Sequence, residues 1–119
     1  MPISVFHCDD SRSFTSLVQA WLQDHPDLEW AGAEHVRERV AASIAAAQPD
    51  VVLLDTMGTP GDGGLLDEVR SAAPHARVVV YSGYVGLMGE DGLAAGADAY
   101  IDKADDEATL VEAIRAVAA

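Results

Sequence analysis

The chain contains little cysteine and no long apolar run, and each shortage excludes a class of protein. Cys8 is the only cysteine, so an internal disulfide bond cannot form. No apolar run approaches the roughly 18 residues that a membrane-spanning helix needs. The first ten residues have no basic stretch before their apolar run and soon become acidic, which is unlike a secretory signal. We therefore expect a cytoplasmic protein with no membrane segment.

Positive charge is also scarce. The chain has 7 Lys and Arg residues against 20 Asp and Glu residues, and its formal net charge is −13. Binding to DNA or to an anionic membrane requires clustered Lys and Arg side chains, so we expect this chain to bind neither directly. The excess of carboxylates is instead compatible with a site for a divalent cation. Among the basic residues only one is a lysine, Lys103.

Short β-like runs alternate with helix-like patterns along the whole chain, with no linker or internal repeat. The expected strands are residues 3–8, 28–33, 51–55, 77–82 and 99–103, and the expected helices are residues 13–25, 36–47, 64–73, 89–97 and 106–119. The runs 51–55 and 77–82 are apolar almost throughout, as in strands that are covered on both faces. This pattern predicts a single α/β domain over residues 1–119, with a parallel sheet between two layers of helices.

Five polar side chains stand at or just after the ends of the expected strands, where parallel sheets bind their ligands. They are Asp9 and Asp10 after the first strand, Asp55 at the third, Ser82 at the fourth and Lys103 at the fifth. Three neighbouring carboxylates raise one another's pKa unless a cation lies among them, and oxygen ligands of this kind suit Mg²⁺. Asp55 beside Mg²⁺, with an amine and a hydroxyl nearby, is equipped to attack a phosphoryl group.

Five motifs follow one another in order. They are "DD" at 9–10, "VVLLD" at 51–55, "DG" at 62–63, "VVVYSG" at 78–83 and "GADAYIDK" at 96–103. Each motif is weak alone, but the set is specific. The successive separations between Asp10, Asp55, Ser82 and Lys103 are 45, 27 and 21 residues. Over essentially its whole length the chain resembles the receiver domain of bacterial two-component response regulators. Its end is most similar to receivers of the LuxR/NarL type, which usually precede a helix-turn-helix DNA-binding domain.

The resemblance implies a flavodoxin-like, doubly wound (βα)5 fold in three layers, with sheet order 2-1-3-4-5. It implies that Asp55 accepts a phosphoryl group from a histidine kinase or a phosphotransfer protein, in a reaction that needs Mg²⁺. Asp10 would bind Mg²⁺ directly and Asp9 mainly through water, and Asp55 and the backbone carbonyl of Met57 would complete the protein ligands. A protein of this kind is a signalling switch rather than a turnover enzyme.

The resemblance also assigns the switch and the output. Lys103 would contact the phosphate, Ser82 would turn toward it, and Tyr100 would be the coupled aromatic residue. The face made by the fourth helix, the fifth strand and the fifth helix would carry the signal and could form a homodimer. The output would be transcription, through a DNA-binding domain that this chain does not contain. The alternative is a stand-alone receiver that acts through protein contacts, and the sequence leaves both open.

Two segments depart from the family pattern. The proline that usually stands four residues after the phosphorylated aspartate is Thr59 here, and Pro60 comes one position later. The fourth helix would contain Gly86, Gly89 and Gly92, and each glycine inside a helix costs about 1 kcal/mol relative to alanine. We therefore expect a different path for the loop after the third strand and a short or partly unwound fourth helix.

The lifetime of the phosphorylated state is also expected to be unusual. In the family, the residues two positions beyond the phosphorylated aspartate and two beyond the switch hydroxyl influence the water that attacks the acyl phosphate. Here these residues are Met57 and Tyr84. A thioether orients water poorly, and the tyrosine ring is bulky enough to screen the phosphate. The resemblance therefore predicts slow self-dephosphorylation.

Two alternative functions remain open from the sequence. The stretch "LLDTMGT" at 53–59 resembles the first motif of haloacid-dehalogenase-type phosphatases. However, Met57 occupies the place of that family's general acid, and a thioether cannot donate the proton. The second alternative is a receiver that binds partners without being phosphorylated. All five chemical positions of the receiver family are filled, which counts against it.

Two further features near the acidic residues have ordinary structural interpretations. His7 stands in the first strand where an apolar residue is expected, and we expect it to be a hydrogen-bonded histidine of the core. The alternative is that it modulates the nearby carboxylates. Asp9 and Asp10 precede a helical pattern, so either could cap that helix, which is compatible with metal binding.

Overall fold

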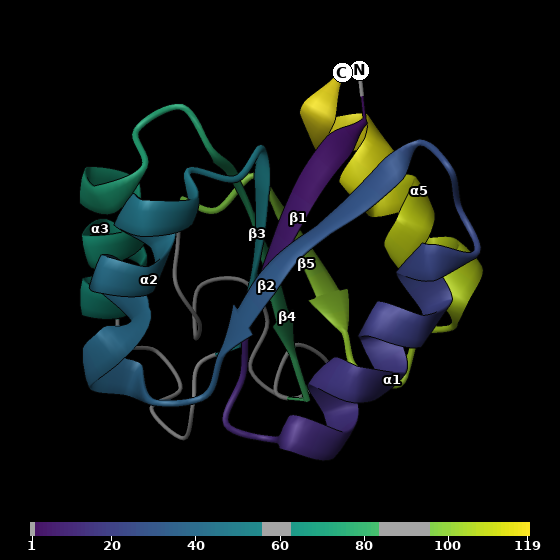
Figure 1. Cartoon of the computed structure of the whole chain (residues 1–119), viewed down its shortest axis with the longest axis horizontal. Helices are drawn as coiled ribbons and strands as arrows, with labels where there is room; N and C mark the ends of the chain where they lie inside the picture. Colours follow the sequence, from purple (N-terminus) through teal and green to yellow (C-terminus); the bar gives the residue numbers. More distant parts are fainter. Residues whose placement is uncertain (1, 56–62, 84–95) are drawn as a thin grey trace.

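A five-stranded parallel sheet lies at the centre of the protein (Figure 1). The computed structural model describes residues 2–55, 63–83 and 96–119. The strands are β1 (Ile3–Cys8), β2 (Leu28–Glu34), β3 (Val51–Leu54), β4 (Arg77–Ser82) and β5 (Ala99–Asp102). They are arranged in the order β2-β1-β3-β4-β5, and every pair of neighbours is parallel. The predicted sheet order is therefore confirmed.

Helices cover both faces of the sheet. They are α1 (Arg12–Gln23), α2 (Val40–Ala47), α3 (Gly63–Ala72) and α5 (Glu107–Ala118), and a short 3-10 helix, η1 (Arg37–Arg39), precedes α2. Figure 1 shows α1 and α5 on one face and α2 and α3 on the other. This is the three-layer arrangement that the alternating pattern predicts. The fourth helix expected at residues 89–97 lies largely outside the described residues, as does the loop that contains Thr59.

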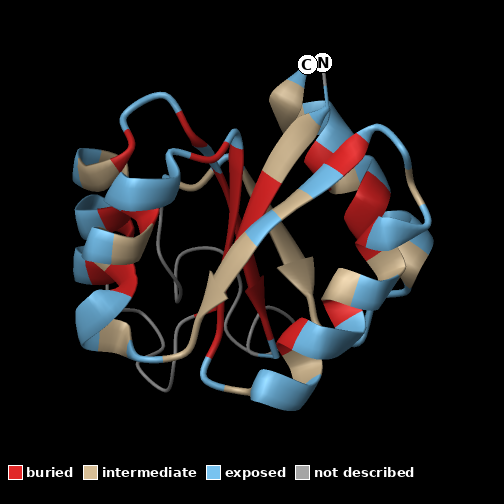
Figure 2. Cartoon of the chain, in the orientation of Figure 1, coloured by how far each residue is buried: buried red, intermediate tan, exposed pale blue. Residues whose placement is uncertain are grey.

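Each face of the sheet has its own hydrophobic core. In β3, Val51 and Leu53 belong to the core under α1 and α5, whereas Val52 and Leu54 belong to the core under α2 and α3. This alternation follows from the two-residue period of a strand. All four residues are buried, as the red colour of the central strands shows in Figure 2. All four residues of β3 are apolar because helices cover both faces of the sheet at this strand.

Local hydrogen bonds set where the helices begin. Ser11 is the N-cap of α1, and its Oγ accepts a hydrogen bond of 3.2 Å from the backbone N–H of Phe14. The capping residue is thus Ser11 rather than Asp9 or Asp10. Asp106 caps α5 in the same way through Thr109 N–H. In both helices the cap satisfies a backbone donor that has no partner inside the helix.

The helix expected at residues 36–47 begins later than the pattern indicates. The carboxylate of Glu34 accepts hydrogen bonds from the backbone N–H groups of His35, at 2.8 Å, and Val36, at 3.0 Å. Val36 has an extended backbone, and the chain then makes a 3-10 turn before α2 starts at Val40. We attribute the later start to these side-chain hydrogen bonds, which hold the end of β2 in an extended form.

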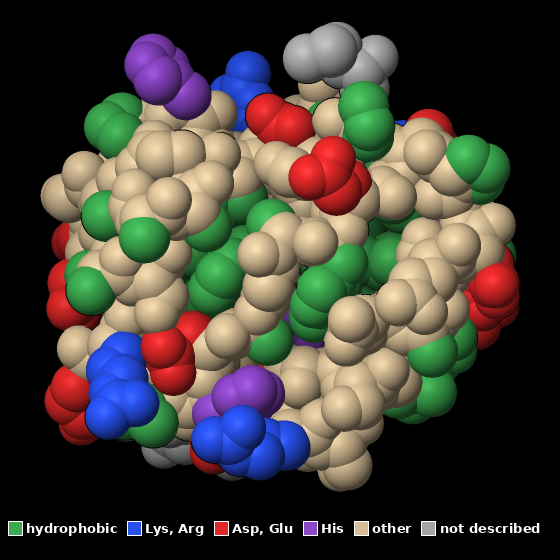
Figure 3. All heavy atoms as spheres, in the orientation of Figure 1, with side chains coloured by type: hydrophobic (Ala, Val, Ile, Leu, Met, Phe, Trp, Pro, Cys, Tyr) green, Lys and Arg blue, Asp and Glu red, His purple; other side chains and the backbone are tan. Residues whose placement is uncertain are grey.

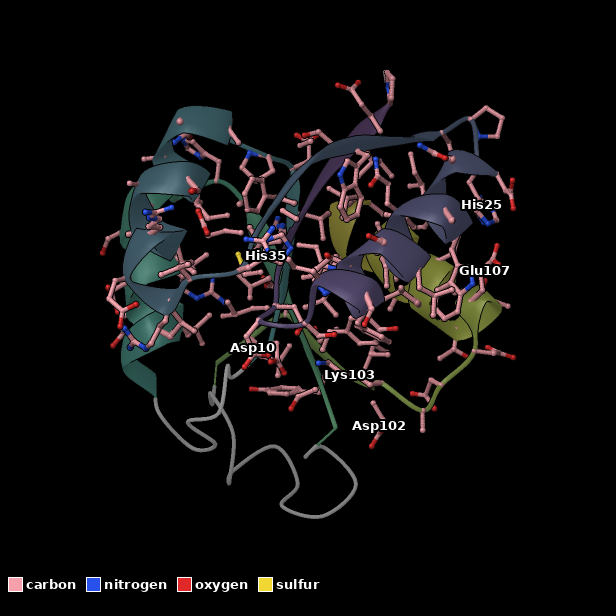
Figure 4. All side chains as sticks on the ribbon, turned by 60° about the horizontal axis from the view of Figure 1, so that its bottom comes forward. Asp10, His25, His35, Asp102, Lys103 and Glu107 are labelled. Atoms are coloured by element: carbon pink, nitrogen blue, oxygen red, sulfur yellow. The ribbon has the colours of Figure 1, made fainter. Side chains whose placement is uncertain are left out.

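Two polar contacts attach α5 to the turn between α1 and β2. His25 Nε2 lies 2.8 Å from Glu107 Oε2, and Figure 4 shows the two side chains facing each other. Arg115 Nε lies 2.8 Å from Asp27 Oδ2. Both pairs are partly exposed, so they orient the helix more than they stabilise it.

Within the described residues, no helix is long and apolar enough to cross a membrane.

Candidate functional site

The three predicted carboxylates lie together at the carboxyl edge of the sheet. β1 and β3 are adjacent, and Cys8 at the end of β1 is paired with Leu54 at the end of β3. This register places Asp9 and Asp10 beside Asp55, whose backbone N–H donates a 2.9 Å hydrogen bond to the carbonyl oxygen of Cys8. One oxygen from each of the three side chains lies within 4.8 Å of the others. Asp9 and Asp55 are buried, whereas Asp10 is exposed.

Lys103 contacts two of these carboxylates. Its Nζ lies 2.7 Å from Asp9 Oδ2 and 3.5 Å from Asp55 Oδ1. The side chain enters the site from the end of β5, where the backbone N–H of Lys103 donates a hydrogen bond to Ser82 O. Figure 4 shows Lys103 and Asp10 at this same edge of the sheet. The only lysine of the chain thus supplies a positive charge inside a cluster of three negative ones.

Asp9 is a buried carboxylate that stays ionised. Burial alone would raise its pKa, because a low dielectric disfavours the charged form. The His7 ring, the Lys103 ammonium and the backbone N–H of Ser11 act in the opposite direction and lower the pKa of Asp9 to about 2. The Ser11 N–H donates a 2.9 Å hydrogen bond to Asp9 Oδ1. Asp9 is therefore held as an anion with a defined orientation.

His7 is fully buried beside Asp9, but it differs from the hydrogen-bonded histidine that the sequence predicts. Its Nε2 lies 3.5 Å from Asp9 Oδ2, and neither ring nitrogen makes a hydrogen bond within the described part of the chain. Instead, the ring packs among the rings of Phe14, Trp30 and Tyr81. Burial is the main cause of a lowered pKa for His7, so the ring is predominantly neutral near pH 7.

Ser82 and Tyr100 lie on β4 and β5, the two strands that follow β3 in the sheet. Ser82 is fully buried at the end of β4, opposite Asp102 of β5. Tyr100 is half-buried on β5 and packs against the core under α2 and α3, and its hydroxyl accepts a 3.2 Å hydrogen bond from Ala97 N–H. The strand order therefore places the predicted hydroxyl and aromatic residue on the Asp55 side of the sheet. Met57 and Tyr84 lie outside the described residues.

The donor atoms of the cluster suit a hard divalent cation. They are carboxylate oxygens only, and the three that lie within 4.8 Å of one another could hold one metal ion. Without a cation, Lys103 is the nearest positive charge to Asp9 and Asp55 among the described residues. The group of side chains within 4.8 Å of one another contains no Cys or His. It therefore differs from structural zinc sites, whose typical ligands are thiolates and imidazoles.

Comparison with known protein families agrees with this geometry. The model of the response regulator receiver domain matches residues 5–115. The chain belongs to this family. Receiver domains are signalling switches of two-component systems and interact with histidine kinases or phosphotransfer proteins. The resemblance carried by the strand-end motifs is thereby confirmed, and the phosphatase alternative is not favoured.

A curated relative of this receiver is longer than the chain. The response regulator protein VraR of Staphylococcus saprophyticus is 26% identical over 121 residues, which cover 97% of this chain and 56% of VraR. The chain therefore spans little more than half the length of this relative. VraR is itself a response regulator, which is the class of protein that the strand-end motifs predict.

Solved structures share the fold of this receiver. A LuxR-family response regulator from Aurantimonas sp. SI85-9A1 has a TM-score of 0.84 and 21% identity, and the match covers 99% of this chain and 86% of that one. CheY6 from R. sphaeroides, solved in complex with the P1 domain of CheA3, has a TM-score of 0.78 and 20% identity. That match covers 98% of this chain and 96% of the other. At these identities the likeness establishes the fold.

A surface cavity of about 360 Å³ lies at the opposite edge of the receiver's sheet. It is lined by Pro2, Ile3, Asp50, His75, Arg77 and Ala118. Ile3 and Arg77 are the first residues of β1 and β4, so this cavity lies at the amino ends of the strands. It contains none of the three clustered carboxylates, and the carboxyl edge remains the better candidate for the functional site.

Proposed function

We propose that this receiver accepts a phosphoryl group on Asp55 from a histidine kinase or a phosphotransfer protein. The observation that supports this most is the position of the Asp55 carboxylate. It lies within the 4.8 Å cluster of carboxylates and 3.5 Å from Lys103 Nζ, at the carboxyl end of a buried strand. A nucleophilic oxygen, a cation and a place for a metal ion are the parts that phosphoryl transfer needs.

The proposed reaction is a displacement at phosphorus. An oxygen of Asp55 forms a bond to the phosphorus atom of a phosphohistidine while the phosphorus–nitrogen bond breaks, and the imidazole nitrogen keeps the electron pair and takes a proton. The Lys103 ammonium neutralises charge on the transferred oxygens. Asp10, Asp55 and the carbonyl of Met57 would hold Mg²⁺ directly, and Asp9 mainly through water. When bound, Mg²⁺ supplies further charge neutralisation at the transferred group.

The proposed switch involves Ser82 on β4 and Tyr100 on β5. The Ser82 hydroxyl turns toward the new phosphate, and Tyr100 changes its packing in response. Their placement supports this step, since Ser82 ends β4 and Tyr100 lies on the adjacent strand opposite Val80. The face made by the expected fourth helix (89–97), β5 and α5 then carries the signal, and β5 and α5 lie within the described residues. We place the protein in the cytoplasm, where kinases of this kind act.

The proposed output is transcription through a DNA-binding domain outside this chain. Similarity to LuxR-type receivers supports this, as does the greater length of VraR. The receiver itself would not contact DNA, because its net charge of −13 opposes binding to phosphates. The same face could also form a homodimer, which would place two output domains side by side.

The test is phosphorylation of the purified chain by acetyl phosphate with Mg²⁺, measured by intact mass. We expect a gain of about 80 Da, the mass of one phosphoryl group, that disappears without Mg²⁺ and in Asp55→Asn. A folded protein that shows no gain with either acetyl phosphate or a phosphorylated histidine phosphotransfer domain would contradict the proposal. That outcome would favour an interaction module that works without phosphorylation.

The same experiment measures the lifetime of the phosphorylated protein. After the donor is removed, we expect the added mass to decay slowly, because Met57 and Tyr84 stand where residues of other receivers influence the attacking water. Met57→Asn supplies an amide that can orient a water molecule, so it should decay faster than the wild type. A wild-type half-life of seconds would rule out the slow self-dephosphorylation.

A further inference from the structure

An aromatic ring lies beside the lysine of the site. Phe14, in the first turn of α1, has its ring centroid 4.8 Å from Lys103 Nζ. A cation within about 6 Å of a ring centroid is attracted by the negative face of the ring. The Lys103 side chain is only 24% exposed, so the attraction is less screened than at the open surface. The ammonium therefore has an anion, Asp9, and an aromatic ring as close neighbours.

The Phe14 ring is itself held in place. Its backbone N–H donates to the Oγ of Ser11, the N-cap residue, which fixes the first turn of α1. The ring packs 5.3 Å from the Tyr81 ring and 5.9 Å from the His7 ring, with interplanar angles of 45° and 72°. Tyr81 and His7 are both fully buried, so the ring rests on a rigid part of the core.

A lysine needs such support more than an arginine does. Its ammonium is a compact charge on a flexible stem with four carbons, and one contact leaves several rotamers open. The 2.7 Å contact with Asp9 fixes the distance of the ammonium from that carboxylate, and the Phe14 ring limits the directions from which the stem can approach. The helical pattern indicates only that Phe14 faces the core, so the sequence alone contains no signal for this role.

We propose that Phe14 is a positioning residue that holds the Lys103 ammonium over the acidic site through a cation–π contact. The placement of the lysine does not depend on phosphorylation. Its consequence for the reaction rests on the proposed function, because there the same ammonium neutralises the transferred phosphoryl group. The two parts are tested by different measurements, so failure of one can be distinguished from failure of the other.

The first measurement uses the fact that the chain has one lysine. Protein labelled with ¹³C-lysine contains a single labelled side chain, Lys103, and its Hε signals report the ring current of a nearby aromatic ring. We expect an upfield shift that is lost in Phe14→Leu and kept in Phe14→Tyr. Leu17→Ala, on the exposed side of α1, is the matched control and should leave the signal unchanged. An unaltered Hε shift in folded Phe14→Leu would overturn the proposal.

The second measurement is the rate of phosphorylation by acetyl phosphate at saturating Mg²⁺. Cation–π contacts contribute about 0.5 to 2 kcal/mol, so Phe14→Leu should slow the reaction roughly twofold to thirtyfold, and Phe14→Tyr should restore it. In a Lys103→Met background the same Phe14→Leu change should have no effect on the rate. An equal slowing in both backgrounds would show that Phe14 acts through packing alone, and would overturn the positioning role in the reaction.

Discussion

His7 and Asp9 are neighbouring ionisable side chains that are both fully buried. They differ in charge near pH 7, where Asp9 is ionised and His7 is predominantly neutral. Asp9 has partners for its negative charge, so its pKa falls to about 2 despite burial. For His7, burial outweighs the attraction of the Asp9 carboxylate 3.5 Å away, so its pKa is lowered below 6.5. A prediction about pH follows from this difference.

We expect the free energy of unfolding to decrease as the pH falls below 6.5. In this range the unfolded chain protonates His7, whereas the folded chain resists protonation because the folded pKa is lowered. The slope from this one group is at most about 1.4 kcal/mol per pH unit. Asp9 contributes only in stronger acid, since its stabilisation is complete above about pH 4 and is lost as the pH falls through about 2.

The check is urea unfolding of the wild type and His7→Leu at a series of pH values from neutral to mildly acidic. The variant should lose most of the decrease seen in the wild type between pH 6.5 and lower pH. His75→Gln changes an exposed histidine and should keep the wild-type slope. A His7→Leu protein with an unchanged slope would contradict the assignment of the effect to His7.

At the scale of elements, the pairing of β1 with β2 contains an irregularity. Val5 pairs with Trp30, but the next residue, Phe6, pairs with Gly32, so β2 has one extra residue at Ala31. Gly32 has a φ of +145°, a conformation that side chains with a Cβ rarely adopt. A Cβ placed there would lie 3.1 Å from Phe6 Cε2. This β-bulge therefore requires a glycine.

We expect Gly32→Ala to reduce the free energy of unfolding by about 1 to 3 kcal/mol. The cost combines an unfavourable φ with crowding against the Phe6 ring. Gly83→Ala is the matched control, because a Cβ at Gly83 would have no atom of the described residues within 4 Å. Denaturant unfolding of both variants gives the comparison. Equal stability of the two variants would mean that the bulge can rearrange at little cost.

At the scale of the whole molecule, charge and the edge of the sheet act in opposite directions on self-association. Acidic side chains are spread over the face shown in Figure 3, and the net charge of −13 makes two copies repel. β5 is an edge strand, and each of its four residues is partly exposed. A strand at the edge of a sheet is a place where a second chain can associate with the sheet. A change at β5 can therefore shift the equilibrium between monomer and dimer.

We expect the unphosphorylated chain to be a monomer of 12.5 kDa and phosphorylation to shift it toward twice that mass. Because salt screens the repulsion between copies, the dimer should be stronger at about 0.2 M than at about 0.02 M NaCl. Light scattering on a sizing column, with Asp55→Asn treated in parallel, measures both effects. A phosphorylated protein that stays monomeric at high salt would contradict the proposed homodimer of this chain.

Much of the fold follows from the sequence pattern, with errors at element boundaries. The bounds of β1 and β4 match the expected residues 3–8 and 77–82, since both runs are mostly apolar, Asp9 follows the first and Ser82 ends the second. The start of α2 does not match, because the Glu34 side chain bonds to backbone N–H groups that a local pattern leaves available for a helix. The expected fourth helix falls largely outside the described residues and stays a prediction.

The sequence by itself determined which residues meet at the carboxyl edge. Strands of a parallel sheet end at one edge, so a polar residue after each apolar run is placed there whatever the details of packing. Only the tertiary structure decided how these side chains are arranged. Lys103 lies closer to Asp9 than to Asp55, the Phe14 ring lies against the lysine, and neither ring nitrogen of His7 has a hydrogen-bond partner among the described residues. The contacts of Lys103 join residues far apart in the chain, and they depend on how α1 packs against the sheet and where β5 pairs within it, which no local pattern specifies.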